Sequence, residues 1–165
     1  MGPLMSMSPY AQTVLIKQAV LNALVAQQAP GGKLASVQSI GPTAFPESNT
    51  YPYIGCDIIK TKEEFIGNHH MRICIDFGIT LSVKTITLLA DAYAIRDSLL
   101  DDGNGNGFLP VLRNMMYTLL GGLITKAEIG ETIFLSNVSQ DRSAAPTEFY
   151  ADVVVMFKVW QNINV

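Results

Sequence analysis

The most constraining feature of this sequence is the stretch "MRICIDFGITLS" (residues 71–82), in which apolar residues alternate with other residue types. Successive side chains of a β-strand point to opposite faces of a sheet, so the alternation predicts a strand. One face carries Ile73, Ile75, Phe77, Ile79 and Leu81, and the other carries Arg72, Cys74, Asp76, Gly78 and Thr80. The sheet therefore has one apolar face for a core and a second face for solvent or a neighbour.

The C-terminal stretch "EFYADVVVMFKVW" (148–160) predicts another long strand. One of its faces is apolar throughout and carries Phe149, Ala151, Val153, Val155, Phe157 and Val159. The opposite face carries Tyr150, Asp152, Val154, Met156, Lys158 and Trp160. This second face is too apolar for a freely solvated surface, which favours a neighbouring subunit as its cover.

The remaining strands are shorter. "YPYIGCDIIK" (51–60) and "ETIFLSNV" (131–138) each predict one strand, and residues 61–70 are interpreted as a turn region. Residues 33–52, rich in Ser, Gly, Pro and Thr, are interpreted as a long surface connection with a short strand around 34–40.

Helical periodicity predicts three helices. The first begins at Ser8-Pro9, where a hydroxyl can cap exposed N–H groups and proline follows, and it ends at residues 29–32, "APGG". The second covers residues 85–100, and a short amphipathic third helix runs from Phe108 to the Gly121-Gly122 pair.

Together these elements predict an α+β fold in a single domain spanning residues 1–165. We expect one antiparallel, mostly four-stranded sheet with two main helices packed on one face, plus a short inserted helix. Residues 1–8 are expected to form a flexible N-terminus. Residues 103–122, a glycine-rich connection and the third helix, are interpreted as an insertion.

Composition narrows the function. Hydrophobic residues make up 48% of the chain and charged residues only 15%, with a net charge of −3, so no basic surface is available to grip duplex DNA. No apolar stretch reaches the roughly 18–20 residues of a membrane span. Two cysteines make no disulfide framework, and the N-terminal residues lack a signal-peptide pattern, so we expect folding in a reducing cytoplasm.

The stretch "LLDDGNGNGFLPVLR" (99–113) resembles the beginning of a calcium loop counted from Asp102. The pattern then fails, because position 9 is Pro110 and position 12 is Arg113, where a bidentate glutamate is needed. A phosphate site is also disfavoured, since these glycines follow a helix and not a strand. We interpret the stretch as a flexible connection.

A zinc site made of Cys56, His69, His70 and Cys74 is disfavoured, because adjacent histidines in an extended chain point to opposite faces. The same residues make a poor Cys–His nucleophile, and no serine lies in a nucleophile elbow. We therefore expect no enzymatic activity, catalytic residue, bound metal or cofactor.

The residues most in need of explanation are methionines and aromatics. Core packing is the usual role of methionine, and a plastic subunit contact is the alternative. We predict a subunit interface that includes Met115, Met116, Tyr150, Met156 and Trp160.

The order of elements resembles the tail terminator proteins of tailed bacteriophages, also called tail completion or neck terminator proteins. The likeness covers residues 9–160: a first helix, a Ser/Pro-rich connection, "YPYIGCDI", "HHMRICIDFGITL", the helix "TLLADAYAIRDSLL" and a long final strand. It implies a homo-oligomeric ring, usually a hexamer, at the head-proximal end of the tail tube. Such a ring ends tube polymerisation and offers an attachment surface to the head-side connector. The segment 103–122 departs from this layout.

The resemblance implies as partners the tail tube protein, the head-side connector or stopper protein and, in tails that have one, a sheath protein. DNA only passes through the lumen, and the location is the tail–neck junction of the virion, after assembly in the host cytoplasm. The alternatives are a head–tail stopper or adaptor, a capping protein of a contractile injection system, a small α+β enzyme and a monomeric binding module.

Overall fold

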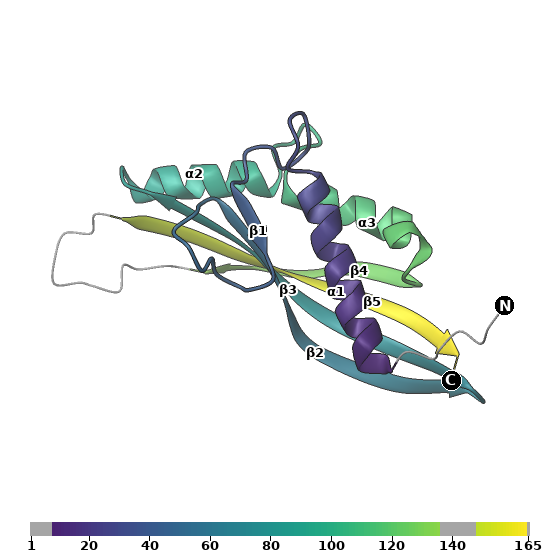
Figure 1. The fold of residues 1–165 in the computed structure, drawn as a ribbon. Helices are drawn as coiled ribbons and strands as arrows, with labels where there is room; N and C mark the ends of the chain where they lie inside the picture. The colour runs from purple at the N-terminus through teal and green to yellow at the C-terminus, as the bar shows by residue number, and fades with distance from the viewer. Residues whose placement is uncertain (1–7, 136–147, 165) are drawn as a thin grey trace, which may run out of the picture.

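The fold is α+β, with one mixed sheet of five strands and three helices (Figure 1). The computed structural model describes residues 8–135 and 148–164. Its strands are β1 (Ser39–Gly41), β2 (Tyr53–Gly67), β3 (His70–Thr85), β4 (Lys126–Leu135) and β5 (Phe149–Asn164). The helices are α1 (Pro9–Ala26), α2 (Leu89–Leu100) and α3 (Phe108–Gly122). The predicted flexibility of residues 1–7 lies outside the described part of the chain.

The strands lie in the order β1-β2-β3-β5-β4. All pairs are antiparallel except β1 with β2, which is parallel and spans only Ser39–Gly41. The prediction of a mostly four-stranded antiparallel sheet therefore holds for β2, β3, β5 and β4. The short strand expected around residues 34–40 is β1, which lies at Ser39–Gly41, and its parallel pairing with β2 makes the sheet mixed.

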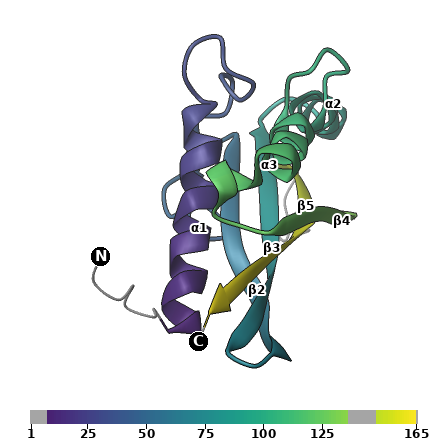
Figure 2. The same ribbon diagram turned by 90° about the vertical axis from the view of Figure 1, so that its right-hand side faces the viewer.

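The main error of the sequence prediction concerns β2, which continues to Gly67 instead of ending near residue 60. Residues 61–67 are part of the strand because they pair with the beginning of β3, and a tight turn at Asn68 and His69 joins the two strands. Both faces of this part of β2 are largely exposed, so it lacks the alternation that reveals a half-buried strand. Figure 2 shows the resulting hairpin extending well past α2 and α3.

Other boundaries also differ from the prediction: α1 ends at Ala26, before residues 29–32, and β5 continues beyond residue 160 to Asn164. β4 begins at Lys126, five positions before the expected start at Glu131. The second helix begins at Leu89 instead of residue 85, after an exposed link that includes Ile86. By contrast, α1 begins as predicted, since the Ser8 hydroxyl accepts a hydrogen bond from the Ala11 N–H at 3.2 Å and Pro9 opens the helix.

All three helices pack on one face of the sheet. α1 contributes Ile16, Val20 and Leu24 to the core, and α3 contributes Phe108 and Leu112. Their sheet partners are the inward residues of β3 and β5: Ile73, Ile75, Phe77, Ile79, Leu81, Val153, Val155, Phe157 and Val159. The alternation of residues 71–82 and 148–160 thus correctly predicts the face of the sheet that is buried in this core.

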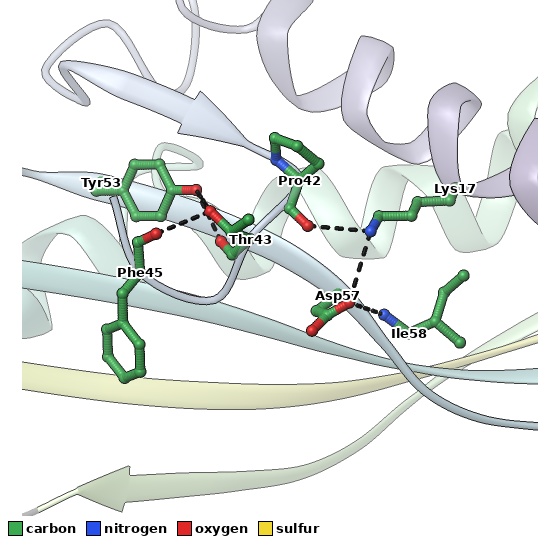
Figure 3. Close-up of polar contacts among 7 residues, drawn as sticks. All are labelled: Lys17, Pro42, Thr43, Phe45, Tyr53, Asp57 and Ile58. Atoms are coloured by element: carbon green, nitrogen blue, oxygen red, sulfur yellow. Dashed lines mark hydrogen bonds and ion pairs between the residues drawn. The ribbon is translucent and has the colours of Figure 1, made fainter. Parts of the chain in front are cut away.

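The opposite face is partly covered by the segment 42–52, which connects β1 to β2. The Tyr53 hydroxyl donates to the Thr43 carbonyl at 2.7 Å, and Lys17 Nζ of α1 donates to the Pro42 carbonyl at 3.0 Å (Figure 3). Gly55 allows this close approach, because a Cβ there would lie 2.0 Å from the Thr43 carbonyl oxygen. The segment therefore buries the part of this face that includes Thr80 and Ser82.

Met115 belongs to the core. Its side chain is only 2% exposed and packs on the helix side of the sheet, so it offers no surface to a neighbouring subunit. The prediction that Met115 lies in a subunit interface is wrong. A helix places residues 115 and 116 about 100° apart, and this rotation decides which of the two faces the sheet.

Replacing Met115 by Ala is expected to destabilise the fold by about 2–5 kcal/mol through loss of buried contacts and the cavity left behind. Chemical denaturation would measure this change. Tyr117→Ala is the matched control on the same helix, because Tyr117 is 86% exposed. A Met115→Ala variant as stable as the Tyr117→Ala variant would contradict the core assignment.

Candidate interaction surface

The most unusual surface of the described chain is the uncovered part of the sheet face opposite the helices, which we term the open face. Its apolar side chains are Ile59, Ile133, Leu135, Val154, Met156 and Trp160. Ile59 is 54% exposed although it is a large aliphatic residue in a strand. A face of this kind is typical of a surface that another chain covers.

Gly78 allows Ile59 to lie flat on the sheet. A Cβ at Gly78 would stand 2.7 Å from Cδ1 of Ile59, and Met156 is the β5 partner of Gly78. A bulge in β2 between Ile58 and Lys60 directs Ile59 onto this face. The bulge and the glycine together create a flat apolar strip beside Met156.

Trp160 lies between two lysines on the same face. Lys126 Nζ is 4.8 Å from the centre of the indole ring, and Lys158 Nζ is 5.5 Å from it. Cation–π attraction holds both ammonium groups over the ring, so the half-buried indole has a charged rim. Tryptophan is enriched where protein surfaces meet, whereas lysine is depleted there, so the indole and not its charged rim favours a contact.

A nearly buried carboxylate, that of Asp76, lies near the centre of the open face between two lysines. Asp76 is only 8% exposed, and its carboxylate lies 3.5 Å from Lys60 Nζ and 3.8 Å from Lys158 Nζ. The two lysines come from the strands on either side of β3. Asp76 therefore fixes the positions of two lysines, and its single negative charge balances one of their two positive charges.

Tyr150 occupies the covered part of the same face. Its hydroxyl donates to Glu148 at 2.7 Å, and its ring meets Tyr51 edge-on with 5.8 Å between centroids. The hydrogen bond to Glu148 is the main reason why the pKa of Tyr150 rises to about 12. Its neighbours in this structure belong to its own chain.

The predicted interface residues are thus only partly brought together. Met156 and Trp160 lie on the open face, whereas Met116 is half-buried on α3, on the helix side of the sheet. Sequence reasoning missed Ile59 and Ile133, because a bulge interrupts the regular alternation near each. For Ile59, the sequence signal that could have revealed the bulge is the pair of adjacent isoleucines at positions 58 and 59, which breaks the alternation of a regular strand.

The glycine-rich stretch is a structured loop. Oδ1 of Asp102 accepts hydrogen bonds from the N–H groups of Asn104 at 2.7 Å and Asn106 at 3.0 Å. Lys33 Nζ donates to the Gly105 carbonyl at 2.8 Å, and the Gly107 N–H donates to the Lys33 carbonyl. The loop is therefore fastened both to itself and to the segment after α1, and the expectation of a flexible connection is corrected.

The two carboxylates of this loop, those of Asp101 and Asp102, already accept hydrogen bonds from other groups of the chain. Hydrogen bonds from the Arg113 guanidinium and the Gly103 N–H lower the pKa of Asp101. The pKa of Asp102 is lowered by the backbone N–H of Asn104 and by the side-chain amide and backbone N–H of Asn106. Arg113, at calcium position 12, is bound to Asp101 at 2.8 Å. The loop thus supplies its own cation and donors.

The four residues considered for zinc do not converge. Cys56 is buried on the helix side, and burial raises the pKa of its thiol to about 12. Cys74 lies on the opposite face, where burial also raises the thiol pKa, while His69 and His70 lie at the end of the β2–β3 hairpin. Among the described residues no three His, Cys, Asp or Glu side chains are grouped to hold a metal ion.

A groove lies between the segment 42–52 and α2. It is lined in part by Tyr51, Lys84, Ile86, Asp91 and Ile95. Its lysine already donates to Asn49 at 2.9 Å and pairs with Glu148 at 3.2 Å. Lys84 therefore fastens the segment to the sheet.

Comparison with known proteins adds no family: no protein-family model matches the chain, and no curated sequence matches it significantly. None of the helices in the described part of the chain is both long enough and apolar enough to cross a bilayer.

Replacing Asp102 by Ala is expected to lower the melting temperature by on the order of a few degrees and to increase proteolysis within residues 101–107, because three donors lose their acceptor. Asn104→Ala is the matched control, since its backbone N–H remains.

The pKa of Asp102 is lowered on folding from its usual 3.8. The contribution of the Asp102 carboxylate to the free energy of unfolding is therefore present above that pH and lost as the pH falls through the lowered value. The difference between wild type and Asp102→Ala should therefore shrink in acid. A difference that grows there would contradict this role.

Proposed function

We propose that this protein is a structural protein of a bacteriophage virion that forms a homo-oligomeric ring, a hexamer, at the head-proximal end of the tail tube. The ring ends tube polymerisation and provides the attachment surface for the head-side connector. The observation that supports the proposal best is the open face, where Ile59, Met156 and Trp160 remain partly exposed on the side of the sheet opposite the three helices.

The surface chemistry supports assembly with protein more than with nucleic acid. The net charge is −3, and the lysines of the open face are paired with Asp76 or Glu64 or held over Trp160. Such a surface has few cations free to bind phosphates, which suits a ring that DNA traverses without being gripped. The proposed partners are further copies of the chain, the tail tube protein and the head-side connector or stopper.

The first test is the mass of the purified protein by light scattering, followed by negative-stain images with and without tail tubes. We expect a ring, free or at tube ends, and tubes that stop growing once it is bound. A monomer that leaves tube growth unchanged would overturn the proposal and favour a binding module. A ring that joins heads but ignores tubes would favour a stopper or adaptor.

Trp160→Ala is expected to weaken ring formation and leave the fold intact, because the indole is half-buried on the open face and not in the core. Its loss should raise the concentration at which rings dissociate by about tenfold or more. Trp160→Phe is the matched control, since it keeps an aromatic ring beneath Lys126 and Lys158. A Trp160→Ala variant that keeps its oligomer mass and only melts earlier would show that the residue serves the fold.

Trp160 is the chain's only tryptophan, so its fluorescence reports directly on this surface. As dilute protein is concentrated into rings, we expect the emission maximum to move to shorter wavelength and quenching by acrylamide to fall, because a neighbour excludes water from the indole. Emission that stays constant while the mass rises would place the subunit contact elsewhere.

A further inference from the structure

The sheet ends in two edges that remain open within the described chain. On one side of the sheet β1 pairs only with residues 53–55 of β2. The outer edge of the rest of β2, on the side away from β3, has no strand of the described chain beside it. On the other side β4 is the last strand of the sheet. Each edge presents unpaired backbone donors and acceptors, which can pair with a strand of another chain.

The two edges have compatible directions. β2, β3, β5 and β4 follow one another in antiparallel steps, so β2 and β4 run in opposite directions. Consider a second copy placed beside the first by rotation about a ring axis, without being turned over. Its β2 then meets β4 of the first copy in antiparallel orientation, and the sheet can continue from copy to copy.

Both edges carry the same charge pattern on the same face. Lys62 lies 2.8 Å from Glu64 on β2, and Lys126 lies 2.8 Å from Glu128 on β4. The register of the sheet places Lys62, Cys74, Trp160 and Lys126 in one row, so both Lys-x-Glu pairs belong to the open face. These charged side chains are at least one-third exposed and are available to another chain.

Antiparallel pairing makes the two patterns complementary. When Lys62 faces Glu128, the opposite running directions make Glu64 face Lys126 two positions further on. Parallel pairing in a similar register would oppose lysine to lysine and glutamate to glutamate. Lysines on an edge strand often serve to block pairing. Here each lysine has a glutamate two residues away, so the second edge satisfies the charges of the first.

We propose that copies of this protein join head to tail, with β4 of one copy added antiparallel to β2 of the next, Lys62 facing Glu128 and Glu64 facing Lys126. This inference rests on the ring of the proposed function and assigns its subunit contact. The regular part of β4, before its bulge between Ile129 and Thr132, supplies the pairing segment. Trp160 lies beside this contact because Lys126 covers its ring.

The test uses two charge reversals, Lys62→Glu and Glu128→Lys. Each alone opposes like charges at every contact and should raise the concentration for ring dissociation by about tenfold or more. An equimolar mixture should form rings again. The reversed β2 of one variant meets the reversed β4 of the other, and the remaining contacts have the original pair. The double variant in one chain should also form rings.

Native mass spectrometry of the mixture, with one variant isotope-labelled, should show equal numbers of the two variants in each ring. Glu47→Lys is the control, an exposed carboxylate of the segment 42–52 that lies on neither edge. Thermal melting of every variant checks that folding is retained. Rings that form with either single reversal as readily as in wild type would overturn the edge pairing and leave the ring proposal standing.

The remaining outcomes separate the two proposals. If both single variants fail to assemble and their mixture fails too, the two residues do not face each other and the pairing is wrong. If the mixture assembles but the wild-type ring does not stop tube growth, the edge pairing stands and the terminator function falls. A wild type that stays monomeric alone and at tube ends overturns both.

Discussion

The antiparallel pairing of β3 with β5 is the constraint on which the rest of the structure depends. Every residue from His70 to Thr85 has a partner between Asn164 and Phe149, without a bulge. An uninterrupted register keeps the two faces of this pair separate along its full length. The apolar face then recruits all three helices, and β2 and β4 attach at the sides. Because the helices all gather on one side, the segment 42–52 is the part of the described chain that covers the other side.

The same register explains why much of the fold can be predicted and where prediction fails. The alternation in residues 71–82 and the Ser8-Pro9 helix start are local sequence signals, and the strand and the cap that they predict are both confirmed. The second half of β2 is missed because residues 61–67 form a strand only through pairing with β3. β1 is too short to show any period. The cover of the second face depends on Thr43 approaching Gly55, a contact that no local pattern reveals.

The candidate surface was predicted only in part, because strand alternation identifies residues of regular strands alone. Strand alternation correctly places Met156 and Trp160 on the less apolar face of β5. It cannot separate Met115 from Met116, since only the rotation of α3 against the sheet makes one of them core. Nor can it find Ile59, which reaches the open face through a bulge and rests on Gly78. The glycine-rich loop looks like a ligand site in the sequence and is not one in the structure. Its acidic residues bind the loop's own backbone and Arg113.

Bulges in the outer strands limit what assembly the sheet can support. β2 has two, between Ile58 and Lys60 and between Phe65 and Gly67, and β4 has one between Ile129 and Thr132. A bulge bends its strand, increases the local twist and interrupts the ladder, so each edge offers a short regular segment instead of a long flat one. A head-to-tail contact closes into a ring only if each copy adds a constant rotation, and otherwise it grows into a filament. The sheet is visibly twisted in Figure 1, so each strand is rotated relative to the next. A short, charged and twisted edge disfavours the open stacking that long, flat apolar edges produce.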